Sequence, residues 1–215
     1  MLRRFDVHRA GSVAEAVELR GRFGDDAAVY AGGTELLMVM KLGVARWRHL
    51  IDVKPISELH HVGVSDGIMR IGAAVTHWTL ERDRGVAEAI PALADLESKV
   101  ANIRVRAAGT LGGNLAFAEP HADPPALLTA LGARVILEGA NGERTLALTD
   151  FITGMYQTAL GPDEILVAVE VPLPAPGARM AYAKFQILER PSVGVAIVAS
   201  VRAGRFAGAP TVVVG

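Results

Sequence analysis

The chain has 215 residues, 51% of them apolar, which is enough to bury a core in one large domain or two small ones. Its 22 basic and 23 acidic side chains give a formal net charge of −1, so charge offers no case for binding nucleic acid or an anionic membrane surface. Because the sequence has no cysteine, it can form neither a disulfide, nor a thiolate nucleophile, nor a cysteine-held iron–sulfur cluster.

The N-terminal segment has charges at Arg3, Arg4 and Asp6, but no apolar stretch follows them as it would in a signal peptide. No part of the sequence approaches the roughly 18 consecutive apolar residues of a membrane-spanning helix. We therefore expect a cytoplasmic chain without a membrane span.

The first elements are predicted around a glycine pair. A helix is expected from Ser12, because Ser12 and Glu15 have the spacing of a capping box, and Gly21 and Gly24 are expected to end it. The short apolar run 27–31 predicts a buried strand, and 34–41 predicts a helix. This strand, glycine turn and helix would place N–H groups and the positive end of the helix where phosphate binds well.

The rest of the chain predicts more strands than helices. Helix starts are expected at Thr76 and Pro91, with 92–100 packed against a sheet. Strands are expected at 49–53, 68–73, 133–138, 144–148 and 165–171, with a hairpin turn at Asn141-Gly142. A proline-rich linker at 171–177 precedes a last unit with a strand at 192–202, a turn at 203–205 and a strand to Val214. The fold class is therefore α+β with mixed strand connections.

Two glycine-rich segments, 31–34 and 110–114, suggest a divided anion cradle. A glycine lets the backbone approach a ligand closely, and consecutive N–H groups in such a turn can converge on phosphate oxygens. Two such turns can hold a pyrophosphate from two sides. Each pair by itself is also compatible with an ordinary tight turn. Asp123 follows the second segment at the start of a helix opened by Pro124 and Pro125, a position that suits a carboxylate binding a diol.

These segments resemble the FAD-binding subunit or domain of the molybdenum hydroxylases, such as the medium subunit of carbon monoxide dehydrogenases and the flavin domain of xanthine dehydrogenases. The similar pieces are 29–36, 109–116 with Pro120 and Asp123, 163–166 and 182–185, and their order and spacing agree from near residue 2 to about residue 200. The resemblance implies a two-subdomain FAD-binding domain of the PCMH type at 1–177, with subdomains of about 1–55 and 56–177. It also implies an incomplete C-terminal flavoprotein domain at 178–215, so we expect a chain shortened at its C-terminus.

The resemblance implies FAD as the cofactor and assigns its binding residues. They are Val29, Tyr30, Ala31, Gly32, Gly33, Thr34, Glu35, Leu36, Thr110, Leu111, Gly112, Gly113, Asn114, Asp123, Leu166 and Lys184. Backbone donors around Gly32, Gly33, Gly112 and Gly113 are expected to contact the cofactor, with side-chain hydrogen bonds from Thr34, Thr110 and Asn114.

Three of these residues have a plain structural alternative. Asp123 would accept a hydrogen bond from a hydroxyl of the cofactor's sugar or ribitol, or it would cap the following helix. Leu166 would pack on the cofactor, or it would be an ordinary core residue. Lys184 resembles the family's flavin-proximal lysine, where a cation stabilises negative charge on the reduced ring, or it would be a solvated surface lysine. The sequence departs from the family at Arg106-Ala107-Ala108-Gly109, where many relatives carry a polar run.

Other chemistries find no support in the sequence. The six histidines show no pair with metal-ligand spacing, and no metal site is assigned. His121 with Asp123 imitates a base and its orienting acid, but flanking prolines favour a fixed surface loop. The Rossmann, Walker and nucleophile-elbow motifs are absent, and no catalytic residue is assigned.

The resemblance implies an FAD-carrying electron-transfer subunit of a molybdenum-hydroxylase-type oxidoreductase, with the cofactor supplying the redox chemistry. Its partners would be an iron–sulfur small subunit and a molybdopterin large subunit, and electrons would leave the flavin to an external acceptor. Two alternatives are a free-standing FAD-dependent reductase of the same fold and a scaffold that has lost the cofactor. The substrate and the acceptor are not encoded in this chain.

Overall fold

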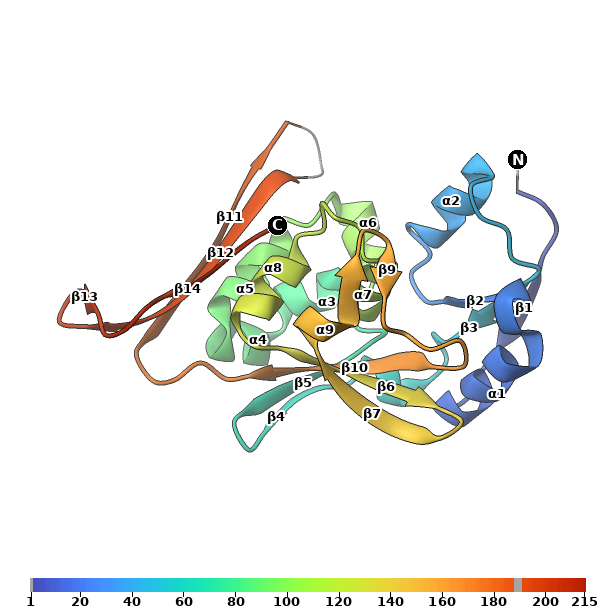
Figure 1. Ribbon diagram of the computed structural model, residues 1–215, viewed down its shortest axis with the longest axis horizontal. Coiled ribbons are helices and arrows are strands. Elements are labelled where there is room, and N and C mark those ends of the chain that lie inside the picture. Colours follow the sequence, from blue (N-terminus) through green and yellow to red (C-terminus); the bar gives the residue numbers. More distant parts are fainter. Residues whose placement is uncertain (1, 188–190) are drawn as a thin grey trace.

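The computed structural model describes residues 2–187 and 191–215. Three larger sheets, one two-stranded hairpin and a layer of short helices make up the described part of the chain, with the N-terminal sheet at one side of the molecule and the C-terminal sheet at the other (Figure 1). In the described part of the chain, no helix is both long and apolar enough to cross a bilayer.

The N-terminal sheet has three parallel strands in the order β1-β3-β2, comprising β1 (Asp6–Arg9), β2 (Ala27–Tyr30) and β3 (His49–Asp52). Helix α1 (Val13–Phe23) and the 3-10 turn η1 (Gly24–Asp26) connect β1 to β2, and helix α2 (Leu36–Leu42) follows β2. Ser12 caps α1 by accepting from the N–H of Glu15 at 3.1 Å, as the sequence predicts. The helix runs through Gly21 and ends at Gly24, and α2 begins two residues later than expected.

The central sheet has five antiparallel strands in the order β4-β5-β10-β6-β7. They are β4 (Val62–Ser65), β5 (Ile68–Gly72), β6 (Arg134–Gly139), β7 (Gly142–Ala147) and β10 (Ile165–Pro172), preceded by the 3-10 turn η2 (Ser57–His60). The predicted strands in this region are confirmed. Strand β10 lies in the middle of the sheet and shifts register between Leu166 and Ala168, and the neighbouring side chains of Val167 and Ala168 both join the core cluster on the α1 side.

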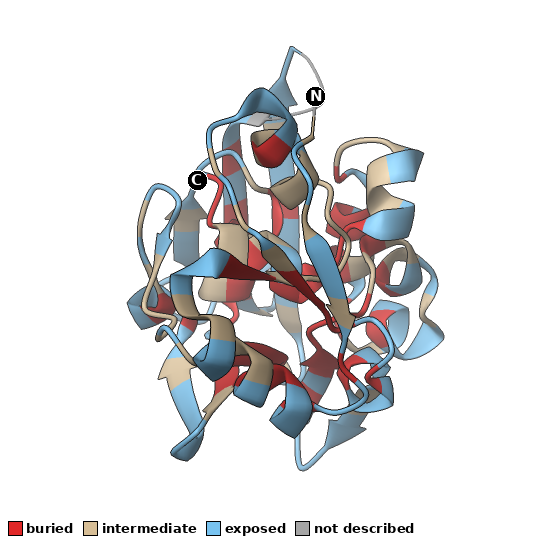
Figure 2. Cartoon of the chain, turned by 90° about the vertical axis from the view of Figure 1, so that its right-hand side faces the viewer, coloured by how far each residue is buried: buried red, intermediate tan, exposed pale blue. Residues whose placement is uncertain are grey.

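A helical layer covers one face of the central sheet (Figure 1). Its helices are α3 (His77–Arg82), α4 (Arg84–Ala89), α5 (Pro91–Ser98), α6 (Ile103–Ala108), α7 (Leu111–Phe117), α8 (Pro124–Ala130) and α9 (Leu148–Phe151). The largest core cluster lies between this layer and the sheet, and buried residues gather inside while the outer faces of the helices are exposed (Figure 2). The starts of α3 and α5 are where the sequence predicts them, whereas α4 and α6 were not predicted.

Helix α1 covers the other face of the central sheet. Its buried residues Val13, Ala16 and Val17 share a core cluster with Ile136 and Val167 of the central sheet. The N-terminal sheet is therefore attached to the central sheet through α1, while α2 lies away from it (Figure 1).

The last sheet contains β11 (Ala178–Gln186), β12 (Pro191–Arg202), β13 (Arg205–Phe206) and β14 (Thr211–Val214), with β12 paired to all three others. Its inner face packs through Tyr182 and Ala196 on the helical layer, whereas Phe185, Val195 and Val214 on the outer face are exposed. A small hairpin of β8 (Ile152–Gly154) and β9 (Gln157–Thr158) comes between β7 and β10 in the sequence.

Candidate functional site

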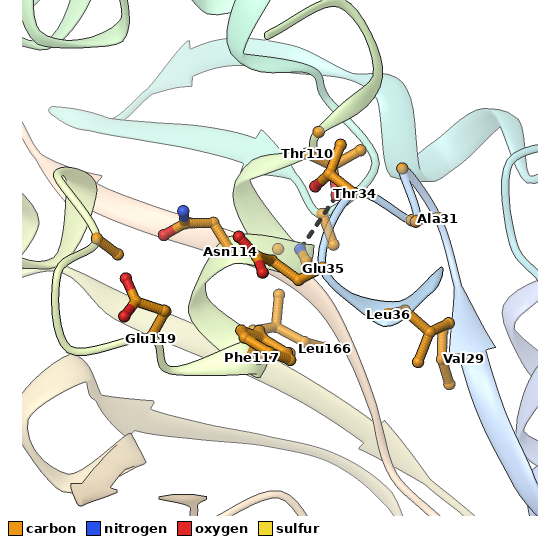
Figure 3. A pocket seen from close by; sticks show the side chains of 18 of the residues that line it. Val29, Ala31, Thr34, Glu35, Leu36, Thr110, Asn114, Phe117, Glu119 and Leu166 are labelled. Carbon is orange, nitrogen blue, oxygen red and sulfur yellow. Dashed lines mark hydrogen bonds between the residues drawn. The ribbon is translucent and has the colours of Figure 1, made fainter. Parts of the chain in front are cut away.

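A cavity of about 410 Å³ lies where the two glycine-rich segments meet, between the edge of the N-terminal sheet and helices α6 and α7. Figure 3 shows Val29, Ala31 and Leu36 on one side of it, Glu119 on the opposite side, and Thr34, Thr110 and Asn114 between them. The cavity is the size of a small-molecule site.

The two glycine-rich segments touch directly. A Cβ on Gly32 would collide with the carbonyl oxygen of Ala108 and lie 2.8 Å from the Cα of Gly109. A Cβ on Gly109 would in turn lie 3.2 Å from Cδ2 of His77 and 3.5 Å from Oγ1 of Thr34. Glycine is needed here because two backbones approach each other, so the pair of segments forms one continuous wall.

The first segment turns sharply and leaves backbone donors unused. Gly33 has a left-handed φ of +71°, and a Cβ there would also collide with the ring of Tyr30. The N–H groups of Gly32, Gly33 and Thr34 have no acceptor within residues 2–187 and 191–215. All three residues line the cavity. Successive N–H groups of this kind form a concave anion-binding surface.

Lys54 holds the first segment from behind. Its ammonium lies 2.6 Å from a carboxylate oxygen of the buried Asp52, 3.6 Å from the centre of the Tyr30 ring and 3.4 Å from the carbonyl oxygen of Ala31. The cation therefore ties the ends of β2 and β3 together and fixes the residue at which the turn begins.

The second segment differs from our prediction, because it is the first turn of helix α7 and its N–H groups are used inside the chain. Leu111 and Gly112 donate to the carbonyl oxygens of Val75 and Ala73 at 3.0 Å each. Gly113 donates to Oγ1 of the capping residue Thr110 at 3.1 Å, and Asn114 donates to the Thr110 carbonyl at 2.9 Å. The expectation of free backbone donors at Gly112 and Gly113 is therefore wrong for this structure.

The second segment contributes side chains instead. Oδ1 of Asn114 is buried and has no hydrogen-bond partner within the described residues, and Asn114 lines the cavity beside Glu35 (Figure 3). Phe117, one helical turn further, places an aromatic ring on the cavity wall next to Leu166 and packs edge-on against Tyr156 at 5.4 Å. An unpaired buried amide oxygen suits a ligand that donates a hydrogen bond.

Asp123 occupies one end of the cavity wall and is held by the last sheet. Its carboxylate accepts from the hydroxyl of Tyr182 at 2.7 Å and pairs with the ammonium of Lys184 at 3.0 Å. Burial, and then the hydrogen bond to Asp123, raises the pKa of the Tyr182 hydroxyl, which therefore stays protonated as a donor. Asp123 makes no side-chain cap to α8, so the capping alternative is wrong.

Lys184 is not the solvated surface lysine of the alternative reading. Its side chain is 6% exposed, and its ammonium also donates to the carbonyl oxygen of Lys99 at 2.7 Å. It lies behind Asp123 rather than on the cavity wall. Leu166 fits both alternatives: it is 6% exposed, as a core residue would be, and it lines the cavity, as a cofactor contact would.

The structure brings most of the predicted residues to one cavity. Those on its wall are Val29, Ala31, Gly32, Gly33, Thr34, Glu35, Leu36, Thr110, Gly112, Gly113, Asn114, Asp123 and Leu166. Tyr30, Leu111 and Lys184 are not on it: Tyr30 packs under Gly33, Leu111 is in the core, and Lys184 supports Asp123. Contact of these residues with FAD stays a prediction.

Other residues on the wall were not predicted from the sequence. His77 is buried and pairs with Glu97 at 2.6 Å, while Oε1 of Glu97 has no partner in the described chain. His121 contacts Glu119 at 2.9 Å through Nδ1, with its side chain 54% exposed. The loop position of His121 is as expected, although it also borders the cavity. Arg20 enters the wall from α1. No local motif marks these residues, because only the packing of distant elements brings them to the cavity.

Comparison with protein families gives a match over residues 3–174 to the family described as the FAD binding domain in molybdopterin dehydrogenase. The carbon monoxide dehydrogenase medium chain of Hydrogenophaga pseudoflava is 40% identical over 183 residues, which cover 85% of this chain and 64% of that protein. The xanthine dehydrogenase FAD-binding subunit of Escherichia coli O157:H7 is 30% identical over 192 residues, covering 89% of this chain and 65% of the relative. The chain thus spans slightly less than two thirds of the length of these relatives.

Solved structures show the same fold. Carbon monoxide dehydrogenase from Hydrogenophaga pseudoflava, in a form that lacks the Mo-pyranopterin moiety, superposes with a TM-score of 0.96 at 36% identity. Quinoline 2-oxidoreductase from Pseudomonas putida 86 gives a TM-score of 0.95 at 32% identity. Both comparisons cover 100% of this chain and 75% of the other. The predicted α+β class of this kind of FAD-binding domain is confirmed.

Proposed function

Since the chain belongs to the family of FAD-binding domains in molybdopterin dehydrogenases, we propose that it is the FAD-carrying electron-transfer subunit of a molybdenum-hydroxylase-type oxidoreductase. When bound, FAD supplies the redox chemistry, and the protein binds, orients and tunes it. The observation that carries the proposal within this chain is the row of unused N–H groups at Gly32, Gly33 and Thr34 on a cavity wall.

The residues present fit this cofactor. The first glycine segment offers backbone donors to a pyrophosphate, and a Cβ on Gly32 or Gly33 would collide with its surroundings. Thr34 and Asn114 add side-chain hydrogen bonds, and the buried Oδ1 of Asn114 gains the partner that it lacks. Thr110, Gly112 and Gly113 shape the wall by packing, while Phe117 and Leu166 supply apolar surface.

Asp123 would accept from a cofactor hydroxyl in addition to Tyr182. Lys184 forms an ion pair with the carboxylate from behind, with its ammonium 3.0 Å from a carboxylate oxygen. In this proposal Lys184 is a positioning residue for Asp123, and any effect on the flavin acts through that pair.

We further propose partner subunits that carry the metal centres. A chain without cysteine depends on another subunit for iron–sulfur clusters, so electrons from a molybdenum-containing subunit would reach the flavin through an iron–sulfur subunit and leave to an external acceptor. The substrate would be chosen by the molybdenum-containing subunit.

The cofactor proposal is tested by titrating the purified chain with FAD, following flavin absorbance and fluorescence, and passing the mixture through gel filtration. We expect one equivalent of FAD to be retained. A folded chain that retains none would count against the proposal, and repeating the titration with a longer chain would show whether further sequence is needed. The assembly is tested by co-purification with a molybdenum-containing and an iron–sulfur subunit, and a chain that associates with neither would contradict it.

A further inference from the structure

Arg20 is a fixed cation on the wall of the cavity. It stands in the last turn of α1, and its Nη1 donates to the carbonyl oxygens of Gly24 and Ala27 at 2.8 Å each. These bonds lock the guanidinium across the link between α1 and β2. Its position is therefore set before any ligand arrives.

The rest of this guanidinium is not used by the chain. No acceptor for Nε or Nη2 of Arg20 is found among the residues described, and the carboxylates that influence it, Asp25 and Asp163, act at a distance without forming an ion pair. Burial lowers the pKa of the Arg20 guanidinium, although an arginine stays protonated in proteins. A partly buried cation with unused donors favours an acceptor-rich ligand.

The free edge of β2 runs along the same wall. Strand β2 ends the order β1-β3-β2, so one of its edges has no partner strand among the residues that the structure describes. Carbonyl oxygens of Asp26 and Tyr30 accept from the β3 side, from Arg48 and Val53. Alternate peptides therefore face outward at Ala27 and Val29, both of which line the cavity. Arg20 donates a hydrogen bond to the Ala27 carbonyl oxygen. The N–H and C=O of Val29 therefore remain as the outward-facing peptide groups at the cavity.

We propose that Arg20 and the outward-facing peptide of Val29 form the subsite for the adenosine half of the dinucleotide, with Arg20 favouring FAD over FMN. This inference rests on the proposed function. An adenine edge carries an amino donor next to a ring-nitrogen acceptor, which is the complement of a peptide C=O and N–H. The guanidinium supplies donors to the remaining ring or ribose acceptors.

The opposite end of the cavity is the better place for the flavin ring. It is bordered by the half-exposed His121, which contacts Glu119. Figure 3 shows Thr34 and Thr110 between Glu119 and Val29. A redox ring must be reachable by electron donors and acceptors outside the chain, whereas adenosine need not be. The end beside Arg20 is lined by the small and buried Ala27 and Ala28.

The test compares Arg20→Leu with the matched control Arg22→Leu, which removes an exposed arginine from the same helix. Affinities for FAD, ADP and FMN are measured by isothermal titration calorimetry. We expect Arg20→Leu to weaken the binding of FAD and of ADP by the same factor of about ten, as for the loss of a charge-assisted hydrogen bond. The affinity for FMN should not change. Arg22→Leu should leave all three unchanged.

Thermal melting of each variant checks that it is folded at the titration temperature. If Arg20→Leu does not fold, Arg20→Gln replaces it, because an amide can still donate toward the Gly24 and Ala27 carbonyls, and the same loss of ADP affinity is expected. Unchanged ADP affinity, or a loss confined to FMN, would overturn the inference while leaving FAD binding intact. A wild-type chain that binds none of the three ligands would overturn the proposed function as well.

Discussion

The two glycine-rich segments look alike in the sequence but do opposite things with their backbone. At the first, Gly32, Gly33 and Thr34 keep N–H groups without acceptors in the described chain. At the second, Gly112 and Gly113 donate to Ala73 and Thr110 within the fold. The first segment therefore keeps donors that a ligand could use, whereas the second uses its donors to hold a helix close to a strand end.

The glycines are needed for different reasons. Gly33 has a backbone conformation that other residues rarely adopt, and Gly32 meets the backbone of Ala108. Gly112 is helical, and a Cβ there would lie 2.5 Å from the Cβ of Ala73 and 2.7 Å from its carbonyl oxygen. A Gly-Gly pair beside a cavity thus does not by itself identify which backbone groups meet the ligand.

The largest effect is expected for Gly112→Ala. Because the new methyl group would meet backbone on the Ala73 side, the variant should lose about 3 kcal/mol of stability, as for overpacking of a core. Urea unfolding of the FAD-free chain measures this. The control is Gly21→Ala, where a Cβ meets nothing within 4 Å in a helix and should add roughly 0.5–1 kcal/mol. Equal stability of Gly112→Ala and wild type would contradict a structural role of the second glycine segment.

The substitution Gly33→Ala should mainly affect the affinity for FAD. A left-handed alanine costs about 1–2 kcal/mol, and the shifted turn should weaken FAD binding by about tenfold or more. The matched control is Gly43→Ala, which has a similar φ of +75° in open space away from the cavity. It should lose less stability than Gly33→Ala, because no ring lies against its new Cβ, and it should keep wild-type affinity in an FAD titration. Equal loss of affinity in both variants would show that strain alone is responsible.

The variant Thr110→Val tests whether the second glycine segment stabilises the fold rather than binding the cofactor. It removes the cap on the N–H of Gly113 and should cost about 1 kcal/mol, while Thr110→Ser keeps the cap and should cost less. If the segment is structural, FAD affinity of the folded valine variant stays within about threefold of wild type. A loss of affinity as large as that of Gly33→Ala would instead give the two segments the same role.

The smallest effect is expected away from both segments, at the ion pair of Arg144 with Glu164 before β10. The hydrogen bond from Arg144 lowers the pKa of Glu164, so the pair stabilises the fold above the ordinary carboxylate pKa and loses this contribution as pH falls through the lowered value. Since Arg144 is well exposed, Arg144→Met should cost only about 0.5 kcal/mol at neutral pH.

Urea unfolding at several pH values measures this difference. The difference between wild type and Arg144→Met should shrink as pH falls below about 4, where Glu164 is protonated in the unfolded chain, and should vanish once pH is below the lowered pKa of Glu164 in the folded chain. A difference that is constant across this range would mean that the arginine acts through packing rather than charge. FAD affinity should be unaffected at neutral pH.

Sequence reasoning located the strands of the central sheet and the helix capped by Ser12, because apolar runs and caps are local signals. It missed α7 as a helix, since two adjacent glycines disfavour helix, and packing against Ala73 outweighs that preference. Most predicted site residues reach the cavity wall, but the sequence could not show whose N–H groups are already used. Arg20 gave no local signal, because only the turn between α1 and β2 brings it to the wall.

The contact of Asp123 with Tyr182 and Lys184 also has a consequence for biosynthesis. The partners of this buried carboxylate come 59 and 61 residues later in the chain. While the chain is being made, a nascent protein that has emerged only as far as β10 already has both glycine segments, but its Asp123 lacks the tyrosine and the lysine. The order of translation thus makes the last sheet the step that completes this end of the cavity, and cofactor loading before that step would meet an unfinished wall.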